Sequence, residues 1–270
     1  MTKLHLRPNA LTLGGLILAI VVAFGLIGVV FHPDVPVDVN NRLVGPTPAH
    51  IFGTDRFGRD IAIQLLIGAK TAMSVAVTSL AIAGVTGTIL GVLAAISKSR
   101  VKLVIEPVTD VLLALPTLLL AVVLGAAFTP STVTATLAIG IAGIPGFIRV
   151  AQATTAQVRH KPFVEAAVLS HVSRPRIIIR HILPNIAGPI AVQASVMMGL
   201  AILAEASLSY LGLGTPAPTP SWGRMLADAQ QYLPTHPIYA LWPGLAIGIS
   251  AYGANLFGDG LRDWLDPRHD

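Results

Sequence analysis

Long uncharged stretches dominate the hydrophobic pattern of the chain. Crossing about 30 Å of hydrocarbon takes roughly 20 helical residues, and apolar stretches of that length recur along the sequence. Because the apolar residues run continuously and do not alternate with polar ones, a membrane β-barrel is excluded. The pattern predicts an all-α membrane protein with six spanning helices, at about 10–31, 71–97, 108–128, 131–152, 182–206 and 237–258.

The third and fourth helices come from one uncharged run, residues 111–148, which is too long for a single span. Residues 128–132 in its middle read Phe-Thr-Pro-Ser-Thr. Clusters of Ser, Thr and Pro between apolar segments are typical of turns. We therefore divide the run into two helices joined by a tight turn.

The first apolar stretch has an alternative interpretation as a cleavable signal peptide, because Lys3 and Arg7 precede it. The apolar core of a signal peptide is usually about 7–15 residues long and is followed by a small-residue cleavage site. This stretch is longer, and no such site follows it. We expect a retained membrane helix.

The composition agrees with a membrane protein and excludes several other classes. Hydrophobic residues make up 53% of the 270 residues and charged residues only 11%, with a mean hydropathy of +0.73. A soluble chain carries about 25% charged residues. Intrinsic disorder, a secreted disulfide scaffold and a nucleic-acid-binding protein are therefore excluded. The chain has no cysteine, so it has no disulfide bond and no thiolate metal site.

The basic residues predict the orientation in the membrane. If the N-terminus is cytoplasmic, 13 of the 18 Lys and Arg residues lie on the inner side and 5 on the outer side. Cytoplasmic loops carry an excess of Lys and Arg, so we expect both termini to be cytoplasmic, in the inner cell membrane. The chain then divides into an N-terminal part with the first helix and an outer segment (1–70), a core (71–258) and a cytoplasmic tail (259–270).

The longest inner segment, about 159–181, contains a short helix between the fourth and fifth spans. Pro162 can open this helix, since a missing N–H costs nothing in the first turn. Glu165 follows close to the N-terminus, where a negative charge is favoured, and two alanines would let another surface approach closely. The sequence Ser173-Arg174-Pro175 ends the helix, which predicts a helix over 162–173 and a second, basic helix after it.

A solvated basic loop that only fixes the topology is the simpler interpretation of this segment, but the order of its residues indicates more. Glu165-Ala166-Ala167, and later His181-Ile182-Leu183-Pro184, resemble the EAA loop of binding-protein-dependent ABC importers. More narrowly, the chain resembles the permease subunits of the dipeptide, oligopeptide and nickel branch of that family.

The resemblance extends over nearly the whole chain and does not rest on the loop alone. Four further stretches are similar to motifs of the branch and occur in the same order. They are GTDRFGRD (53–60), DVLLALP (110–116), EASLSYLGLG with PSWG (205–214 and 220–223) and the terminal NLFGDGLRDWLDPR (255–268).

The resemblance implies one half of a channel pair in an ATP-driven importer. The expected partners are a homologous second permease, two cytoplasmic ATPase subunits or domains, an extracytoplasmic substrate-binding protein and the lipid bilayer, and nucleic acid is not expected. The inner helix would couple ATP hydrolysis to movement of the spans. The residues carried over to this role are Pro162, Glu165, Ala166, Ala167, His171, Arg174 and Arg176.

One position departs from the family pattern. The family has glycine at the seventh position of the motif, counting its Glu as the first, and His171 stands there. Glycine permits a positive φ or a very close contact, and histidine supplies neither readily. Either the turn is built differently, with help from Ser170 and Ser173, or the docking surface is bulkier than in the family.

The chain lacks the motifs that ATP hydrolysis or proteolysis would need. It has no G-x-x-x-x-G-K-[ST] phosphate loop, no G-x-S-x-G and no H-E-x-x-H. We expect no enzyme activity and no cofactor or metal in this chain, with ATP and Mg²⁺ bound by the ATPase partners. A proton-coupled secondary carrier is the alternative, although it would need a carboxylate near mid-bilayer. Peptides are the preferred substrate, with nickel or another solute left open.

The outer segment holds a cluster of both charge signs. Asp55, Arg56, Arg59 and Asp60 are predicted to contact the binding protein or shape an outer gate, and the alternative is an internal salt-bridged cap over helix ends. Trp222 is added to the same set, and we expect it to anchor its loop at the membrane interface, where indoles settle.

Overall fold

The computed structural model describes residues 7–30, 35–97 and 100–265, and its regular structure there is helical apart from one isolated bridge between Thr54 and Asp60. The prediction of an all-α protein is confirmed. The helices are α1 (Arg7–Val30), α2 (Ile61–Ile96), α3 (Arg100–Ala114), α4 (Thr117–Ala126), α5 (Thr132–Val158), α6 (Pro162–Leu169), α7 (Arg174–Ile177), a π-helical turn (Ile178–Ile182), α8 (Leu183–Tyr210), α9 (Trp222–Ala229) and α10 (Ile238–Leu265), with short 3₁₀ turns at Val39–Asn41 and Gln230–Tyr232.

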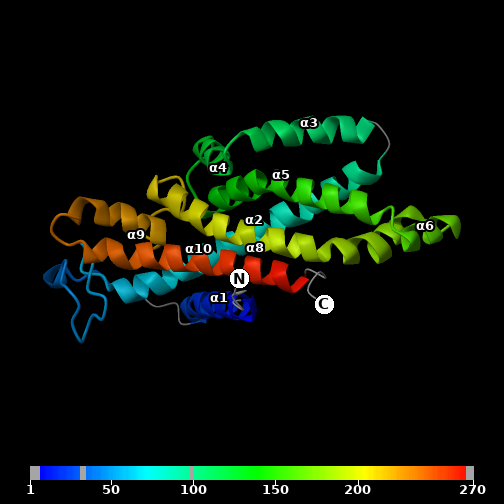
Figure 1. Ribbon diagram of the computed structural model, residues 1–270. Helices are drawn as coiled ribbons and strands as arrows, with labels where there is room; N and C mark the ends of the chain where they lie inside the picture. Colours follow the sequence, from blue (N-terminus) through cyan, green and yellow to red (C-terminus); the bar gives the residue numbers. More distant parts are fainter. Residues whose placement is uncertain (1–6, 31–34, 98–99, 266–270) are drawn as a thin grey trace, which may run out of the picture.

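The long helices lie side by side along one axis of an elongated molecule (Figure 1). The short helix α6 lies at one end, which we call the α6 end. Residues 35–60 and α9 lie at the opposite end, which we call the loop end. The two regions singled out by sequence are therefore at opposite ends of the helix bundle.

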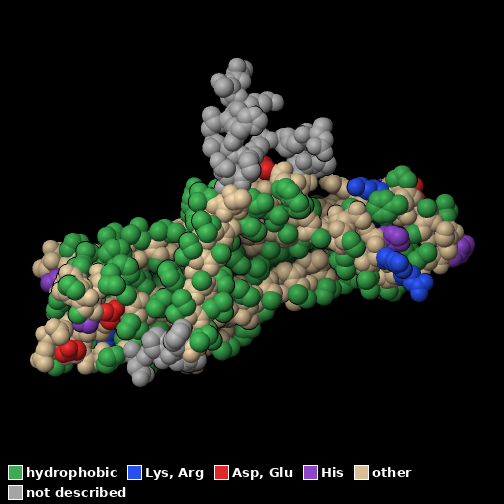
Figure 2. All heavy atoms as spheres, turned by 90° about the horizontal axis from the view of Figure 1, so that it is seen from below, with side chains coloured by type: hydrophobic (Ala, Val, Ile, Leu, Met, Phe, Trp, Pro, Cys, Tyr) green, Lys and Arg blue, Asp and Glu red, His purple; other side chains and the backbone are tan. Residues whose placement is uncertain are grey.

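Several helices are long and apolar enough to cross a membrane. Four qualify by length and composition, and a fifth qualifies if α3 and α4, which meet at an angle of 93°, count as one broken span. Helix α10 is not among them, so the six-span count remains a prediction. Hydrophobic side chains cover the middle of the face shown in Figure 2, and Lys and Arg side chains gather at its α6 end. Such an apolar belt is expected of a surface that faces lipid.

Two predicted helix boundaries are wrong. The second span was expected to begin at 71, after Lys70, but α2 begins at Ile61 because the Asp60 side chain caps it by accepting hydrogen bonds from the Ala62 and Ile63 amides. The third span was expected as one helix, 108–128, but the chain bends sharply before α4, which begins after Pro116. A residue that precedes proline is disfavoured in helical geometry.

The predicted turn between the third and fourth spans is confirmed. Helix α4 ends at Ala126 and α5 begins at Thr132. The Ser131 side chain accepts a hydrogen bond from the Thr134 amide and so caps the start of α5.

Small residues let α2 and α5 pack closely in the centre of the bundle. A β-carbon added at Gly87 would lie 2.5 Å from the Cβ of Phe147, and one at Gly91 would lie 2.5 Å from the carbonyl oxygen of Ile148. Small residues at helix interfaces are typical of membrane bundles because backbones can then approach each other. The backbones of α2 and α5 therefore approach each other closely at these positions.

Candidate functional site

Helix α6 begins as its sequence predicts. Pro162 occupies the first turn, and the Lys161 carbonyl accepts hydrogen bonds from the Val164 and Glu165 amides. Glu165 lies in this first turn with its side chain exposed. The carboxylate is thus close to the positive end of the helix dipole, which stabilises the helix start.

The two alanines of the motif have different environments, one exposed and one buried. Val164 and Ala167 are buried, with 3% and 8% of their surfaces exposed, and belong to an apolar cluster with Val92, Ala151 and Ile186 of the long helices. Ala166 is exposed, like Glu165. The expectation that both alanines form an open docking surface is therefore wrong for Ala167, whose small side chain lets α6 lie against the bundle.

The exposed side of α6 is largely apolar. Phe163, Val168 and Leu169 are exposed, and Leu169 retains 78% of its surface. Ala166 is exposed as well, and α6, which carries all four residues, lies at one end of the molecule (Figure 1). Contiguous exposed apolar patches mark surfaces that interact with a protein or a membrane, so this side of α6 is a candidate interaction surface.

The helix ends at Leu169, four residues earlier than the predicted end at Ser173. The His171 amide donates to the Val168 carbonyl, the Val172 amide donates to the Ala167 carbonyl, and His171 has a φ of 56°. This is the Schellman arrangement, whose left-handed position usually holds glycine. The turn is therefore not built differently, because His171 adopts the backbone conformation that glycine favours.

After the turn that ends α6, the chain returns to the bundle through a helical segment that is continuous from α7 to α8. Arg174 and Arg176 are exposed on α7, and the π-helical turn Ile178–Ile182 joins α7 to α8 without a loop. The ring of His181 on the π-helical turn lies 6.3 Å from the ring of Phe163 on α6. Helix α6 thus lies against the π-helical turn that leads into α8.

A cavity of about 380 Å³ lies between α6 and the neighbouring helix ends. Ser97, Arg159, His160 and Arg174 contribute the polar part of its lining. The Arg159 guanidinium also donates to the Ala95 carbonyl at 2.6 Å, which ties the end of α5 to the end of α2.

At the loop end, Asp55 organises the segment that resembles the family motif. Its carboxylate is fully buried, accepts from the Phe57 and Arg59 amides and the Gln64 side chain, and pairs with the Arg59 Nε at 2.7 Å. Asp60 caps α2 and lies 2.8 Å from His50 Nδ1. Asp55 and Asp60 thus form their contacts within this segment and at the start of α2. These contacts agree with the interpretation as an internal salt-bridged cap over a helix end.

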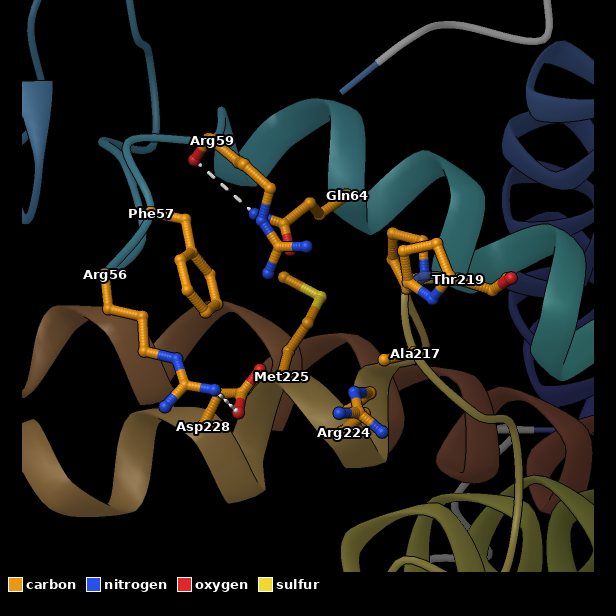
Figure 3. A pocket seen from close by; sticks show the side chains of 11 residues that line it. Arg56, Phe57, Arg59, Gln64, Ala217, Thr219, Arg224, Met225 and Asp228 are labelled. Atoms are coloured by element: carbon orange, nitrogen blue, oxygen red, sulfur yellow. Dashed lines mark hydrogen bonds and ion pairs between the residues drawn. The ribbon is translucent and has the colours of Figure 1, made fainter. Parts of the chain in front are cut away.

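The two arginines of this segment flank a small pocket (Figure 3). Arg56 pairs with Asp228 of α9 at 2.9 Å, which joins two segments that are 172 residues apart. Trp222 is only 3% exposed and donates to the Leu65 carbonyl at 3.0 Å. Its predicted place at the membrane interface is wrong, because the indole packs over Gly68 inside the protein.

Sequence reasoning missed three acidic or basic side chains at this end. Arg224 lines the pocket and Asp228 pairs across it, and nothing local in the sequence indicates either role. Glu205 is 1% exposed on α8. Its Oε1 accepts from the Ser209 hydroxyl at 2.7 Å. Within the described ranges, no three His, Asp or Glu side chains are placed to hold a metal ion.

Comparison of the chain with known proteins identifies the family to which it is similar. Residues 87–270 match the family described as binding-protein-dependent transport system inner membrane component. The chain is 39% identical over 98% of its length to the dipeptide transport system permease protein DppC of Alkalihalophilus pseudofirmus, and covers 88% of that protein. It is 38% identical over 93% of its length to the probable D,D-dipeptide transport system permease protein DdpC of Escherichia coli, and covers 86% of that protein.

A solved structure has the same fold. A chain of the MetNI methionine ABC transporter in an inward-facing conformation aligns with a TM-score of 0.62 at 14% identity. The alignment covers 75% of this chain and 96% of that one. On the match over residues 87–270 and the 39% identity over 98% of its length to a permease protein, the chain belongs to the family of binding-protein-dependent transport system inner membrane components.

Proposed function

We propose that this chain is the membrane-spanning permease subunit of an ATP-driven importer that moves di- or oligopeptides, or related small solutes, into the cell. Its relatives are named dipeptide and peptide transport permeases. Selection among such solutes would reside largely in a separate binding protein, so peptide is the preferred class and nickel or another small solute is left open.

The observation that carries the proposal is the surface of α6. An exposed apolar patch around Ala166, formed with Phe163 and Leu169, stands at the end of a short helix whose other side is fixed to the bundle by Val164 and Ala167. A helix held on one side and bare on the other suits insertion into a cleft of an ATPase subunit. Glu165 would lie at the edge of this contact, with Arg174 and Arg176 on the following turn.

Coupling would then be mechanical. Movement of the ATPase subunits would displace α6, and the continuous segment from α7 through the π-helical turn into α8 would carry the displacement into the bundle. Such rigid-body transmission requires the two states to differ in their contacts at α6. Pro162 and His171 would keep the helix ends fixed, so that α6 moves as one piece.

The remaining assignments follow from this role. The partners would be a second, homologous permease, two ATPase subunits that bind ATP and Mg²⁺, and an extracytoplasmic binding protein. The sequence holds no phosphate-binding loop of its own. With six spans and both termini cytoplasmic, the α6 end would lie in the cytoplasm and the loop end outside. Residues 1–70, 71–258 and 259–270 would be the anchor, core and tail, with α10 extending to Leu265.

A proton-coupled secondary carrier is the second candidate function, and the buried Glu205 is the observation that favours it. A carboxylate inside a membrane bundle is a candidate for proton transfer. Glu205 Oε1 already accepts from Ser209, and Oε2 has no hydrogen-bond partner among the described residues. The importer is preferred because it also accounts for the exposed surface of α6.

Transport in proteoliposomes separates the two functions. The complex of the two permeases and two ATPase subunits would be reconstituted with the binding protein, and uptake of a radiolabelled dipeptide would be measured. The importer predicts uptake that requires ATP and is unchanged by an imposed proton gradient. Uptake driven by the proton gradient without ATP would refute the importer and support the carrier.

A further inference from the structure

The small pocket at the loop end is lined by segments from opposite halves of the chain. Residues 56–64 form one side, the loop 217–220 a second and α9 the third, and the cavity measures about 100 Å³. Ligand sites for small molecules usually span about 300–1,000 Å³. This pocket therefore has room for a single functional group and not for a peptide.

Two positive charges are held against the same aromatic ring in this pocket. The guanidinium carbons of Arg56 and Arg59 lie 4.5 and 4.9 Å from the centre of the Phe57 ring, and Figure 3 shows the ring between them. Guanidinium groups stack favourably on aromatic faces. The Phe57 ring thus holds both guanidinium groups in place. Both arginines line the pocket, so their remaining N–H donors are available there.

Most of these donors are unused among the described residues. A guanidinium has five N–H groups, and Arg56 uses one for Asp228 while Arg59 uses its Nε for Asp55. The Nε of Arg56 is buried without a hydrogen-bond partner. Burying a donor without an acceptor costs free energy, so the arrangement favours an additional acceptor.

The pocket also has an excess of positive charge. Asp55 and Asp228 each neutralise one arginine, and no ion pair is formed by the third, Arg224, within the described part of the chain. In Figure 3, Arg224 lies on the far side of Met225 from Arg56. Three guanidinium groups against two carboxylates leave one positive charge for an incoming anion.

We propose that this pocket binds one carboxylate side chain, an Asp or Glu on the surface of the extracytoplasmic binding protein. This inference rests on the proposed function, which puts the loop end outside the cell. The pocket is too small for a free peptide, and a carboxylate offers the two acceptor oxygens that guanidinium groups bind best. Arg224 supplies the unneutralised charge, and Arg56 and Arg59 supply the fixed donors.

The first test compares two arginines in the same outer region. Arg42 is exposed and does not line the pocket, so Arg42→Gln removes the same charge without touching it. Binding of the purified binding protein of the same transport system to the nanodisc-embedded importer would be measured by biolayer interferometry. Arg224→Gln should weaken binding about fivefold at low salt and about twofold or less at 0.5 M salt, because screening weakens such contacts. Arg42→Gln should leave it within about twofold.

A chemical test identifies the occupant directly. In an Arg224→Lys variant, a water-soluble carbodiimide would join the lysine amine to a carboxylate in contact with it, and mass spectrometry would locate the bond. The proposal predicts a bond to an acidic residue of the binding protein, absent from the Arg42→Lys control.

The outcomes separate the proposal from the function on which it rests. Equal effects of Arg224→Gln and Arg42→Gln, or equal cross-linking in the two lysine variants, would overturn the carboxylate pocket while leaving the importer intact. Failure of the unaltered importer to bind the binding protein at all would overturn the proposed function and the pocket together.

Discussion

Replacing His171 by glycine should strengthen the end of α6. His171 occupies the left-handed position of the Schellman turn with a φ of 56°. The two hydrogen bonds that close the helix depend on this backbone conformation and not on the imidazole. His171→Gly keeps the hydrogen bonds and removes the steric cost of a side chain at positive φ.

The expected size of the effect follows from two opposing terms. A residue with a β-carbon costs about 1–2 kcal/mol in the left-handed region, and histidine tolerates it better than most. Glycine loses about 0.5–1 kcal/mol more backbone entropy on ordering. The difference is about 0–1.5 kcal/mol, and its middle value of about 0.7 kcal/mol lowers the equilibrium constant for local opening roughly threefold.

Hydrogen exchange measures this opening at the relevant amides. The amides of His171 and Val172 close the turn, so peptides covering residues 162–175 should exchange more slowly in His171→Gly. The matched control is Ser170→Gly, because Ser170 precedes the turn with a φ of −77°. That variant gains no steric relief and should exchange faster.

A β-branched residue provides the opposite perturbation. His171→Val should open the turn more often, since β-branched residues are strongly disfavoured at positive φ. The reasoning is refuted if His171→Gly exchanges as fast as the unaltered protein or faster, or if His171→Val is protected as well as His171→Gly.

Two further predictions concern the frame, with thermal unfolding in detergent as the measurement. Gly91→Leu should destabilise the bundle by about 1–3 kcal/mol through overpacking against α5. The control Gly248→Leu should not destabilise it, because an added β-carbon there meets nothing within 4 Å. Equal losses of stability in the two variants would refute the close packing. Asp60→Ala should cost about 1–2 kcal/mol by removing the cap of α2, and Asp60→Asn should retain most of that stability; an unchanged melting temperature in Asp60→Ala would contradict the cap.

Local signals in the sequence were sufficient for much of the fold. The start of α6 at Pro162 and the turn before α5 follow from proline and capping chemistry within a few residues. The bend before α4 also has a local signal in Pro116, but the uniformly apolar run around it favours one uninterrupted helix. The predicted start of α2 after Lys70 was wrong because α2 is longer than the membrane is thick. A charged residue is tolerated in the part of such a helix that extends beyond the membrane.

The site was predictable in place but not in orientation. The motif predicted the position of α6 in the sequence. Which alanine is buried depends on how α6 packs against the bundle, and in the structure Ala167 is buried and Ala166 is exposed. At the loop end, the pairing of Arg56 with Asp228 joins residues 172 positions apart. Such contacts arise from the packing of the whole bundle, and no local pattern in a single sequence indicates them.

Disulfide trapping at adjacent alanines tests the central claim most directly. The chain has no cysteine, so Ala166→Cys and Ala167→Cys each introduce a single thiol, one exposed and one buried. Each variant would be assembled with ATPase subunits that carry single cysteines along the cleft facing the membrane, and then oxidised. The account predicts a disulfide bond from position 166 and none from position 167. It is contradicted if position 166 forms no bond with any cleft cysteine, or if the two positions react equally.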